Sequence, residues 1–350
     1  MSEFLSKKYS LLTPYTPGEQ PRDKKYVKLN TNESPYPPCK AVVEAMTVEA
    51  VESLRLYCDP TGKKLKEAIG GRYGVNANSV FLSNGSDDIL NFSFMAFGEK
   101  GAAYPDITYG FYEVFAALHS VPSEIIPLKD DFSIDKADYL GKNKLIVIAN
   151  PNAPTGLTLP LRDIEEIVAF NPQSVVLIDE AYVDFGAESA VKLTQKYDNL
   201  LVVHTFSKSR SMAGARLGYA IGSEGIINDL ETVKYSTNPY NVNTLTQILG
   251  VKTIENDAYY MENCQKIIRT REFLTAELQK MGFSVLPSKA NFIFAKTDKM
   301  GGEELYLRLK DEGVLVRHFT LDRIKDFNRI TVGSDEEAAI LIDKIKQILD

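Results

Sequence analysis

The chain has 350 residues, of which 44% are hydrophobic and 25% charged, so it can bury one large core and a smaller second one. Its formal net charge of -7 comes from interspersed acidic and basic residues and offers no basic stripe for a nucleic-acid backbone. No apolar run approaches the roughly 20 residues of a membrane span, and the N-terminus lacks a secretory signal pattern. We therefore expect neither a nucleic-acid partner nor a membrane association.

The three cysteines, Cys39, Cys58 and Cys264, are widely spaced and odd in number, which fits neither a disulfide framework nor a zinc site. We expect reduced thiols, no bound metal and a cytoplasmic protein. His204 lies inside an apolar run, where a packed or hydrogen-bonded histidine is more common than a metal ligand.

Residues 1–30 include a proline-rich, charged stretch, LTPYTPGEQPRDKK, which cannot form a regular element. We expect these residues to lie as an N-terminal arm over the rest of the protein. From about residue 60, helical and strand patterns alternate. KKLKEAIGGRYG predicts an amphipathic helix ending at glycine, SVFLS a short strand, and GSDDILNFSFMAF a helix capped by Ser86.

Four β-rich runs follow, separated by helical or loop segments: KLIVIAN, SVVLIDEA, NLLVVHTFS and GYAIG. The alternation predicts an α/β fold with a mostly parallel, helix-covered sheet in a large domain over residues 31–250. A long helical stretch and further short strands and helices then predict a smaller α+β domain over residues 251–350. Its last helix should begin with a capping box formed by Ser334 and Glu337.

Polar residues follow three successive strands of the predicted sheet. PNAPTG follows the first strand, Asp179 ends the second, and Lys208 comes just after the third. Ligands of open α/β sheets bind at the carboxyl ends of the strands. A buried carboxylate is costly unless it faces a cation, so Asp179 either binds a cationic ligand group or caps a helix in the segment that follows.

Other residues near these strand ends suit an anionic ligand group. The segment NGSDD offers backbone N–H groups at the start of a helix, where anions bind. Thr205, Ser207 and Arg216 add two hydroxyls and a guanidinium that fit a phosphate. These groups describe a ligand with a phosphate, a cationic ring nitrogen and a carbonyl that can condense with Lys208. Pyridoxal phosphate meets that description.

With these residues in place, the chain resembles the fold type I pyridoxal-phosphate enzymes, and among them most closely the histidinol-phosphate aminotransferase family. The resemblance spans nearly the whole chain. It rests on motifs in this order: LTPY, LNTNESPYPP, RLYCDPTG, LSNGSDD, YPDITYGFY, NPNAPTG, DEAYVDF, TFSKSRSMAGARLG and RITVGS. It implies the fold type I architecture and pyridoxal 5'-phosphate as the cofactor.

The resemblance also implies individual roles. Lys208 would hold the cofactor covalently and, once displaced by substrate, move a proton between Cα and C4′. Asp179 would keep the ring nitrogen protonated, Tyr182 would hydrogen-bond the ring's phenolic oxygen, and Tyr109 would stack on the ring. The phosphate region would comprise the backbone N–H of Asp87, whose carboxylate would repel the anion, together with Gly85, Ser86, Thr205, Ser207 and Arg216.

Further residues are implied on the substrate side and at a subunit interface. Arg329 resembles the family's arginine for the anionic group of the substrate, and Tyr15 and Asn32 resemble residues near it. Tyr57 resembles the tyrosine that reaches the phosphate from the partner subunit, which implies a homodimer with shared active sites.

One position departs from the family pattern. Ala153 stands where the family usually has an asparagine directly before P-T-G, hydrogen-bonded to the ring's phenolic oxygen. Asn152 could compensate after a backbone shift, or Tyr182 could act alone.

The resemblance implies a ping-pong aminotransferase of histidine biosynthesis, exchanging an amino group between L-glutamate/2-oxoglutarate and L-histidinol phosphate/imidazole acetol phosphate. Two alternatives use the same cofactor residues: a threonine-phosphate decarboxylase, which would break the bond to the carboxylate, and a broader aromatic amino acid aminotransferase. A non-catalytic cofactor-binding regulator would need an added effector domain, for which the arm and the two domains leave no residues. The amino acceptor, closure of the arm and assembly beyond a dimer stay open.

Overall fold

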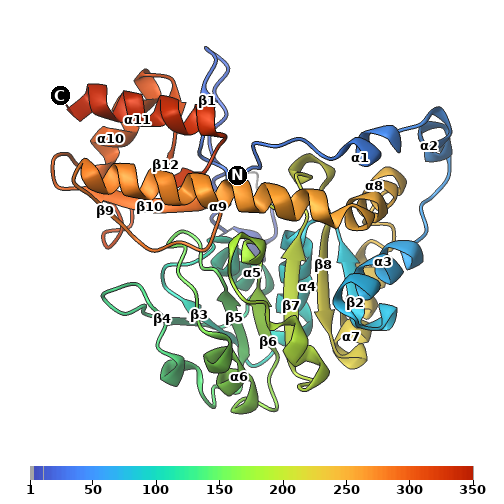
Figure 1. Cartoon of the computed structure of the whole chain (residues 1–350). Coiled ribbons are helices and arrows are strands. Elements are labelled where there is room, and N and C mark those ends of the chain that lie inside the picture. The colour runs from blue at the N-terminus through green and yellow to red at the C-terminus, as the bar shows by residue number, and fades with distance from the viewer. Residues whose placement is uncertain (1–3, 11, 350) are drawn as a thin grey trace.

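A computed structural model describes residues 4–10 and 12–349, so positions 1–3 and 11 of the predicted arm lie outside the described residues. A large sheet with helices on both faces forms the lower body in Figure 1, and a small sheet with its own helices lies above it. Within the described ranges, no helix is both long and apolar enough to cross a bilayer.

The large sheet has seven strands in the order β2-β8-β7-β6-β5-β3-β4. Its strands are β2 (Val80–Ser83), β3 (Ala102–Pro105), β4 (Ser123–Ile126), β5 (Leu145–Ala149), β6 (Val176–Asp179), β7 (Leu200–Thr205) and β8 (Gly218–Gly222). The five strands from β7 to β4 pair in parallel. The predicted α/β fold with a mostly parallel sheet is therefore confirmed.

One strand runs against the expected direction. The run GYAIG forms β8, which is antiparallel to both of its neighbours, β2 and β7. Only residues 206–217 connect β7 to β8, and their one helical element is the 3-10 turn η7 (Ala213–Ala215). A parallel crossover usually contains an α-helix that packs on the sheet, and this connection has none, so the chain reverses beside β7. The connection carries Lys208.

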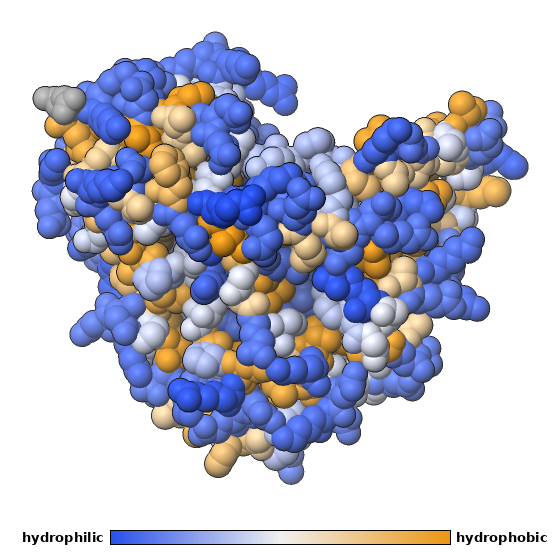
Figure 2. Space-filling model, viewed as in Figure 1, coloured by the Kyte–Doolittle hydropathy of each residue, from blue (hydrophilic) through white to orange (hydrophobic). Residues whose placement is uncertain are grey.

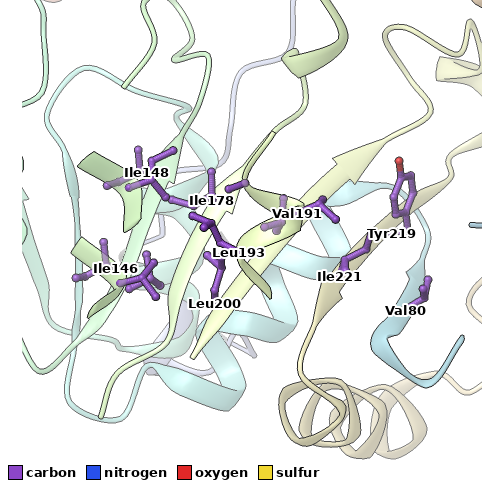
Figure 3. Close-up of a cluster of buried hydrophobic side chains, with 14 of the residues drawn as sticks. Val80, Ile146, Ile148, Ile178, Val191, Leu193, Leu200, Tyr219 and Ile221 are labelled. Atoms are coloured by element: carbon purple, nitrogen blue, oxygen red, sulfur yellow. The ribbon is translucent and has the colours of Figure 1, made fainter. Parts of the chain in front are cut away.

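Two hydrophobic cores cover the two faces of the large sheet. Along β5, Ile146 and Ile148 point into one core, whereas Val147 points into the other, as the period of a strand requires. Figure 3 shows the first core, which includes Ile178 and Ile221. It packs against α3 (Lys63–Tyr73), α6 (Leu161–Ala169) and α8 (Thr244–Glu255), and the second against α4 (Ser86–Phe97), α5 (Phe111–His119) and α7 (Glu224–Thr237).

The start of α4 differs from the prediction that Ser86 caps it. Gly85 occupies the N-cap position with φ +86°, and no side-chain oxygen caps the helix. A residue with a Cβ is strained at that φ, whereas glycine is not. Ser86 is thus the first helical residue, and the first-turn N–H groups lie free of a side-chain cap.

The small sheet is antiparallel, in the order β12-β13-β10-β9. Ser334 and Glu337 form the predicted capping box, because the Ser334 N–H donates to Glu337 Oε2 (2.8 Å) and the Glu337 N–H to Ser334 Oγ (3.2 Å). The elements are β9 (Phe283–Val285), β10 (Phe292–Thr297), β12 (Arg317–His318), β13 (Asn328–Thr331), α9 (Asp257–Lys280), α10 (Gly302–Asp311) and α11 (Asp335–Leu349).

The residues before the large sheet contact both the small sheet and the large unit. The strand β1 (Val27–Lys28) pairs in parallel with β11 (Val314–Leu315), and Leu29 lies in the core of the small sheet. The helices α1 (Lys40–Glu44) and α2 (Val48–Glu52) extend along one side of the large unit (Figure 1). We propose the division into an arm, a large domain (31–250) and a small domain (251–350), which the separate sheets and cores support.

Candidate active site

Two adjoining cavities lie at the carboxyl ends of β5, β6 and β7. The first cavity, of about 350 Å³, is bordered by Asp179, Thr205 and Ser207, among others. The second cavity, of about 340 Å³, is bordered by residues of the arm and by Arg317 and Arg329 of the small sheet. Both are bordered by Thr31, Tyr109, Ala153, Tyr182 and Lys208, so a ligand in either would meet the lysine.

Asp179 presents a deeply buried carboxylate to the first cavity. Only 4% of the residue is exposed, and its oxygens accept hydrogen bonds from the Tyr112 hydroxyl (2.9 Å) and the Ala181 N–H (3.2 Å). Burial raises the pKa of this carboxyl to about 6, despite the hydrogen bonds that favour the charged form. A cation in the cavity would offset this cost, as the sequence predicts.

Lys208 begins a turn that the Ser211 N–H closes by donating to the Lys208 carbonyl (3.3 Å). Its Nζ donates to the carbonyl of Thr31 (3.2 Å) and lies 5.7 Å from the centre of the Tyr182 ring. The structure therefore brings Lys208 to one cavity with Asp179 and Tyr182, which come from the end of β6 and the loop after it.

Asn32 orients Tyr182. The Asn32 amide nitrogen donates to the Tyr182 hydroxyl (3.0 Å), and its amide oxygen accepts from the Thr331 hydroxyl (2.9 Å). Because Thr331 ends β13, this chain of hydrogen bonds joins the small sheet to the loop after β6.

The predicted phosphate region is assembled around Arg216. Ser86, Asp87, Thr205 and Ser207 border the first cavity with it. The Asp87 carboxylate lies 3.1 Å from the Arg216 guanidinium and also accepts a hydrogen bond from the Tyr109 hydroxyl (2.8 Å). We expected only the backbone N–H of Asp87 to contribute here. Its carboxylate instead occupies the place of an anion beside Arg216.

Gly85 permits this arrangement by its lack of a side chain. A Cβ built on Gly85 would lie 2.6 Å from Nη2 of Arg216. The guanidinium therefore needs the glycine in order to reach the start of α4.

The structure does not bring Asn152 into contact with the first cavity. Its amide oxygen accepts from the Thr108 hydroxyl (2.9 Å), and its nitrogen donates to the Ile107 carbonyl (2.9 Å) and the Thr155 hydroxyl (3.1 Å). Ala153 borders the cavity in its place. These bonds tie the Asn152 amide to Ile107, Thr108 and Thr155, so compensation for Ala153 by Asn152 would need a backbone shift, and Tyr182 acting alone is the other alternative.

Two arginines face the second cavity from adjacent strands. Arg317 and Arg329 lie directly opposite each other on the antiparallel strands β12 and β13. Like charges in this position repel unless an anion lies between them. Arg329 donates to the Asn30 carbonyl (2.9 Å), while its Nε has no hydrogen-bond partner among the described residues. The pair therefore suits a ligand with a phosphate or carboxylate.

The arm closes one side of the second cavity. Arg317 donates to the carbonyls of Thr16 (3.3 Å) and Pro17 (3.4 Å), and Tyr15 stacks on Phe111 with ring centres 4.2 Å apart. Tyr15 thus lies beside Tyr109 at the border of the cavity.

Tyr57 lies far more exposed than the other predicted residues. It is 83% exposed, stacks on Tyr240, and does not border either cavity within the single chain. Exposed hydrophobic residues gather over α1 and α2, at the upper right of the molecule in Figure 2; they include Val43, Val48 and Leu56.

Sequence reasoning missed Arg317, Tyr112 and Glu33, which borders the first cavity and contacts Lys28. Arg317 could have been found from its position in VLVRHF, opposite RITVGS in a predicted sheet. Tyr112 carries no such signal, because its contact with Asp179 joins residues 67 positions apart.

A family model and a protein of similar sequence both match this chain over most of its length. The family model for aminotransferase class I and II matches residues 24–345. Histidinol-phosphate aminotransferase from Brachyspira hyodysenteriae is 52% identical over 352 residues, which is 100% of this chain and 99% of that protein.

Two solved structures show the same fold. Histidinol-phosphate aminotransferase from Sinorhizobium meliloti, in complex with pyridoxal-5'-phosphate, gives a TM-score of 0.90 at 22% identity, covering 100% of this chain and 98% of that one. L-threonine-O-3-phosphate decarboxylase from Porphyromonas gingivalis gives 0.80 at 21% identity, covering 92% and 99%. The fold by itself therefore does not separate transamination from decarboxylation.

Proposed function

The chain belongs to the aminotransferase class I and II family, with histidinol-phosphate aminotransferases among its relatives, and on this premise we propose a pyridoxal-phosphate-dependent transaminase. It would exchange the amino group between L-glutamate/2-oxoglutarate and L-histidinol phosphate/imidazole acetol phosphate. One observation carries the proposal: Lys208 borders both cavities. It shares the first with buried Asp179 and the second with Arg317 and Arg329.

The first cavity fits pyridoxal phosphate at both of its charged ends. Asp179 is a buried carboxylate that forms no ion pair with the residues the structure describes, and a protonated ring nitrogen would supply a cation. Arg216 already holds an anion, the Asp87 carboxylate, with which a phosphate would compete. Gly85, Ser86, Thr205 and Ser207 would complete the phosphate contacts, and Tyr109 would lie on the ring.

When bound, pyridoxal phosphate supplies a carbonyl that condenses with amines and a ring that accepts electrons from the substrate Cα. Lys208 would hold the cofactor covalently in the resting enzyme. Its free amine would carry the proton between the substrate Cα and C4′. Asp179 would hold the proton on the ring nitrogen, and Tyr182, oriented by Asn32, would donate to the phenolic oxygen.

Arg317 and Arg329 would hold the anionic group of the substrate, with Tyr15 covering it from the arm. The two guanidinium groups together match the charge of a phosphate monoester. We expect Arg329→Lys to raise KM for L-histidinol phosphate about 10- to 100-fold, because lysine loses the planar fork of donors. Steady-state kinetics would show this, with Arg308→Lys, an exposed residue paired with Glu304, as the matched control.

If Arg329→Lys left KM within twofold of the unchanged protein, the substrate anion would lie elsewhere. A fall in kcat alone would also contradict this placement, because the arginine acts on binding.

We further propose a cytoplasmic homodimer in which Tyr57 completes the site of the partner. Its exposure and the hydrophobic surface over α1 and α2 support a contact of this kind. We expect a particle of about twice the 39.0 kDa chain mass in sedimentation.

Mixed dimers test the sharing of sites. A dimer of one Lys208→Ala chain and one Tyr57→Ala chain should regain one intact site and about half of the normal activity. If Tyr57 served its own chain, no intact site would form, and activity would not exceed that of the Tyr57→Ala homodimer.

The identity of the reaction is tested by comparing three amines as substrates. Cofactor-loaded protein would be incubated with 2-oxoglutarate and, separately, L-histidinol phosphate, L-threonine phosphate or L-phenylalanine. We expect the highest kcat/KM for L-histidinol phosphate, with L-glutamate as the second product. Release of carbon dioxide from L-threonine phosphate would instead indicate the decarboxylase, and preference for L-phenylalanine the aromatic aminotransferase.

A further inference from the structure

The carboxylate of Asp184 accepts hydrogen bonds from two side chains of the turn that carries Lys208. Ser209 and Arg210 are the two central residues of the turn that the Ser211 N–H closes onto the Lys208 carbonyl. The Ser209 hydroxyl donates to Asp184 Oδ2 (2.5 Å), and Arg210 Nη1 donates to the same oxygen (3.1 Å). Both central residues of the lysine turn thus depend on Asp184.

Asp184 lies two residues after Tyr182 in the chain. It belongs to the 3-10 turn η5 (Val183–Phe185), which begins directly after Tyr182. Burial alone would raise the pKa of the Asp184 carboxyl, but the Arg210 guanidinium and the Ser209 hydroxyl hold it below its ordinary value. The carboxylate is therefore charged and ties the lysine turn to the tyrosine turn.

Arg210 extends the connection to a third element. Its side chain is 2% exposed, and Nη2 lies 2.7 Å from Oδ1 of Asp257, the first residue of α9. Asp257 also pairs with Arg72 of α3 (3.1 Å). Figure 1 shows α9 running from the side of α8 to the small sheet. The lysine turn is thus fixed against a helix of the small domain that begins beside the large one.

We propose that Asp184 and Arg210 are positioning residues for the proton-transferring amine of Lys208. A lysine side chain has four rotatable carbon bonds, so the place of its amine depends on how firmly its backbone is held. Asp184 fixes that backbone relative to Tyr182, whose ring centre lies 5.7 Å from the Lys208 amine. The inference rests on the proposed function, in which this amine carries the Cα proton.

The test removes the ion pair without leaving a buried charge alone. In the double variant Asp184→Asn/Arg210→Met, both partners become neutral, and Asp257 keeps Arg72 as its partner. Arg210→Lys serves as the milder variant should the double variant fail to fold. Arg72→Met is the matched control, because it loosens the same network at Asp257 without touching the lysine turn.

The first measurement is steady-state kinetics with L-histidinol phosphate, beside thermal unfolding of each variant. We expect the double variant to lose about 10- to 100-fold in kcat with KM within about twofold, since small misplacements of a reacting group cost this much. The control should keep its kcat within about twofold. A kcat loss that follows the loss of thermal stability equally in the control and the double variant would overturn the proposal.

The second measurement does not depend on catalysis. Cofactor-free protein would be labelled with limiting acetic anhydride, and the labelling of Lys208 relative to Lys252, whose side chain is 43% exposed, would be followed by mass spectrometry. We expect the relative labelling of Lys208 to change at least about threefold in the double variant and not in Arg72→Met. Unchanged labelling would overturn the proposal even if the protein proved not to be a transaminase.

Discussion

Replacement of Lys208 by alanine is expected to lower the rate of transamination by about 10³-fold or more, while the protein stays folded. The substitution removes the amine that ties the cofactor to the protein and that moves the Cα proton, and proton transfer alone contributes about 10²- to 10⁴-fold. Lys208 lies half-buried at the border of both cavities, and its amine has one hydrogen bond, to the Thr31 carbonyl. Loss of so few contacts costs little stability.

The measurement is the turnover of L-histidinol phosphate with 2-oxoglutarate, together with thermal unfolding of the cofactor-free variant. Lys252→Ala is the control, because Lys252 lies on the exposed side of α8 and pairs with Glu255. Full activity in Lys208→Ala would show that another group carries the proton, and the catalytic assignment would be wrong.

Asp179→Asn is expected to lower kcat by about 10²- to 10³-fold and to weaken cofactor binding. A buried charge aimed at the reacting group is worth this much, because the surrounding medium screens it poorly. An asparagine keeps the size of the side chain and can still accept from the Tyr112 hydroxyl, but it cannot hold the proton of a ring nitrogen.

The same substitution should stabilise the cofactor-free protein at high pH. Burial raises the pKa of Asp179 to about 6, above its unfolded value near 4, so the folded state disfavours the charged form. The destabilisation is complete above about pH 6 and disappears below about pH 4. A shift of two pKa units corresponds to about 3 kcal/mol of unfolding free energy.

Denaturant unfolding of cofactor-free protein at pH 8 and pH 4 checks this effect. Asp179→Asn should be more stable than the unchanged protein at pH 8 and equal to it at pH 4. Asp198→Asn, at an exposed aspartate, should show no such difference. A destabilised Asp179→Asn at pH 8 would mean that the carboxylate already has a sufficient partner inside the protein.

The parts of the site that the sequence predicts well are those set by local pattern. Asp179 and Lys208 follow strands whose Leu, Ile and Val runs identify them as buried, and parallel pairing brings their ends to one edge of the sheet. The capping box of Ser334 and Glu337 is predictable for the same reason, since both partners lie within one helical turn.

The parts that the sequence does not predict depend on contacts between distant residues. The bond from Asn32 to Tyr182 joins positions 150 residues apart, and the opposition of Arg317 and Arg329 depends on the register of two short strands. The hydrogen bonds of Asn152 to Thr108 and Ile107 likewise reach another loop, and the sequence does not predict them. Such pairs become visible only once the chain is folded.

Backbone geometry explains the remaining differences. The direction of β8 follows from the lack of an α-helix in the connection before it, and no residue within GYAIG reveals it. Gly85 at the N-cap position of α4 takes a φ of +86°, where the prediction had assigned the cap to Ser86. A glycine before a helix is compatible with both arrangements, so the pattern alone could not decide.

The most direct test of the whole account is an absorbance titration of cofactor-loaded protein with L-histidinol phosphate in the absence of 2-oxoglutarate. We predict that the visible band of the lysine-linked cofactor disappears, with one imidazole acetol phosphate released per chain, and that the cofactor is recovered in its amine form. A band that persists in excess L-histidinol phosphate, while another amine converts it, would contradict the proposed substrate. The absence of any lysine-linked band would contradict the role of Lys208 and the account built on it.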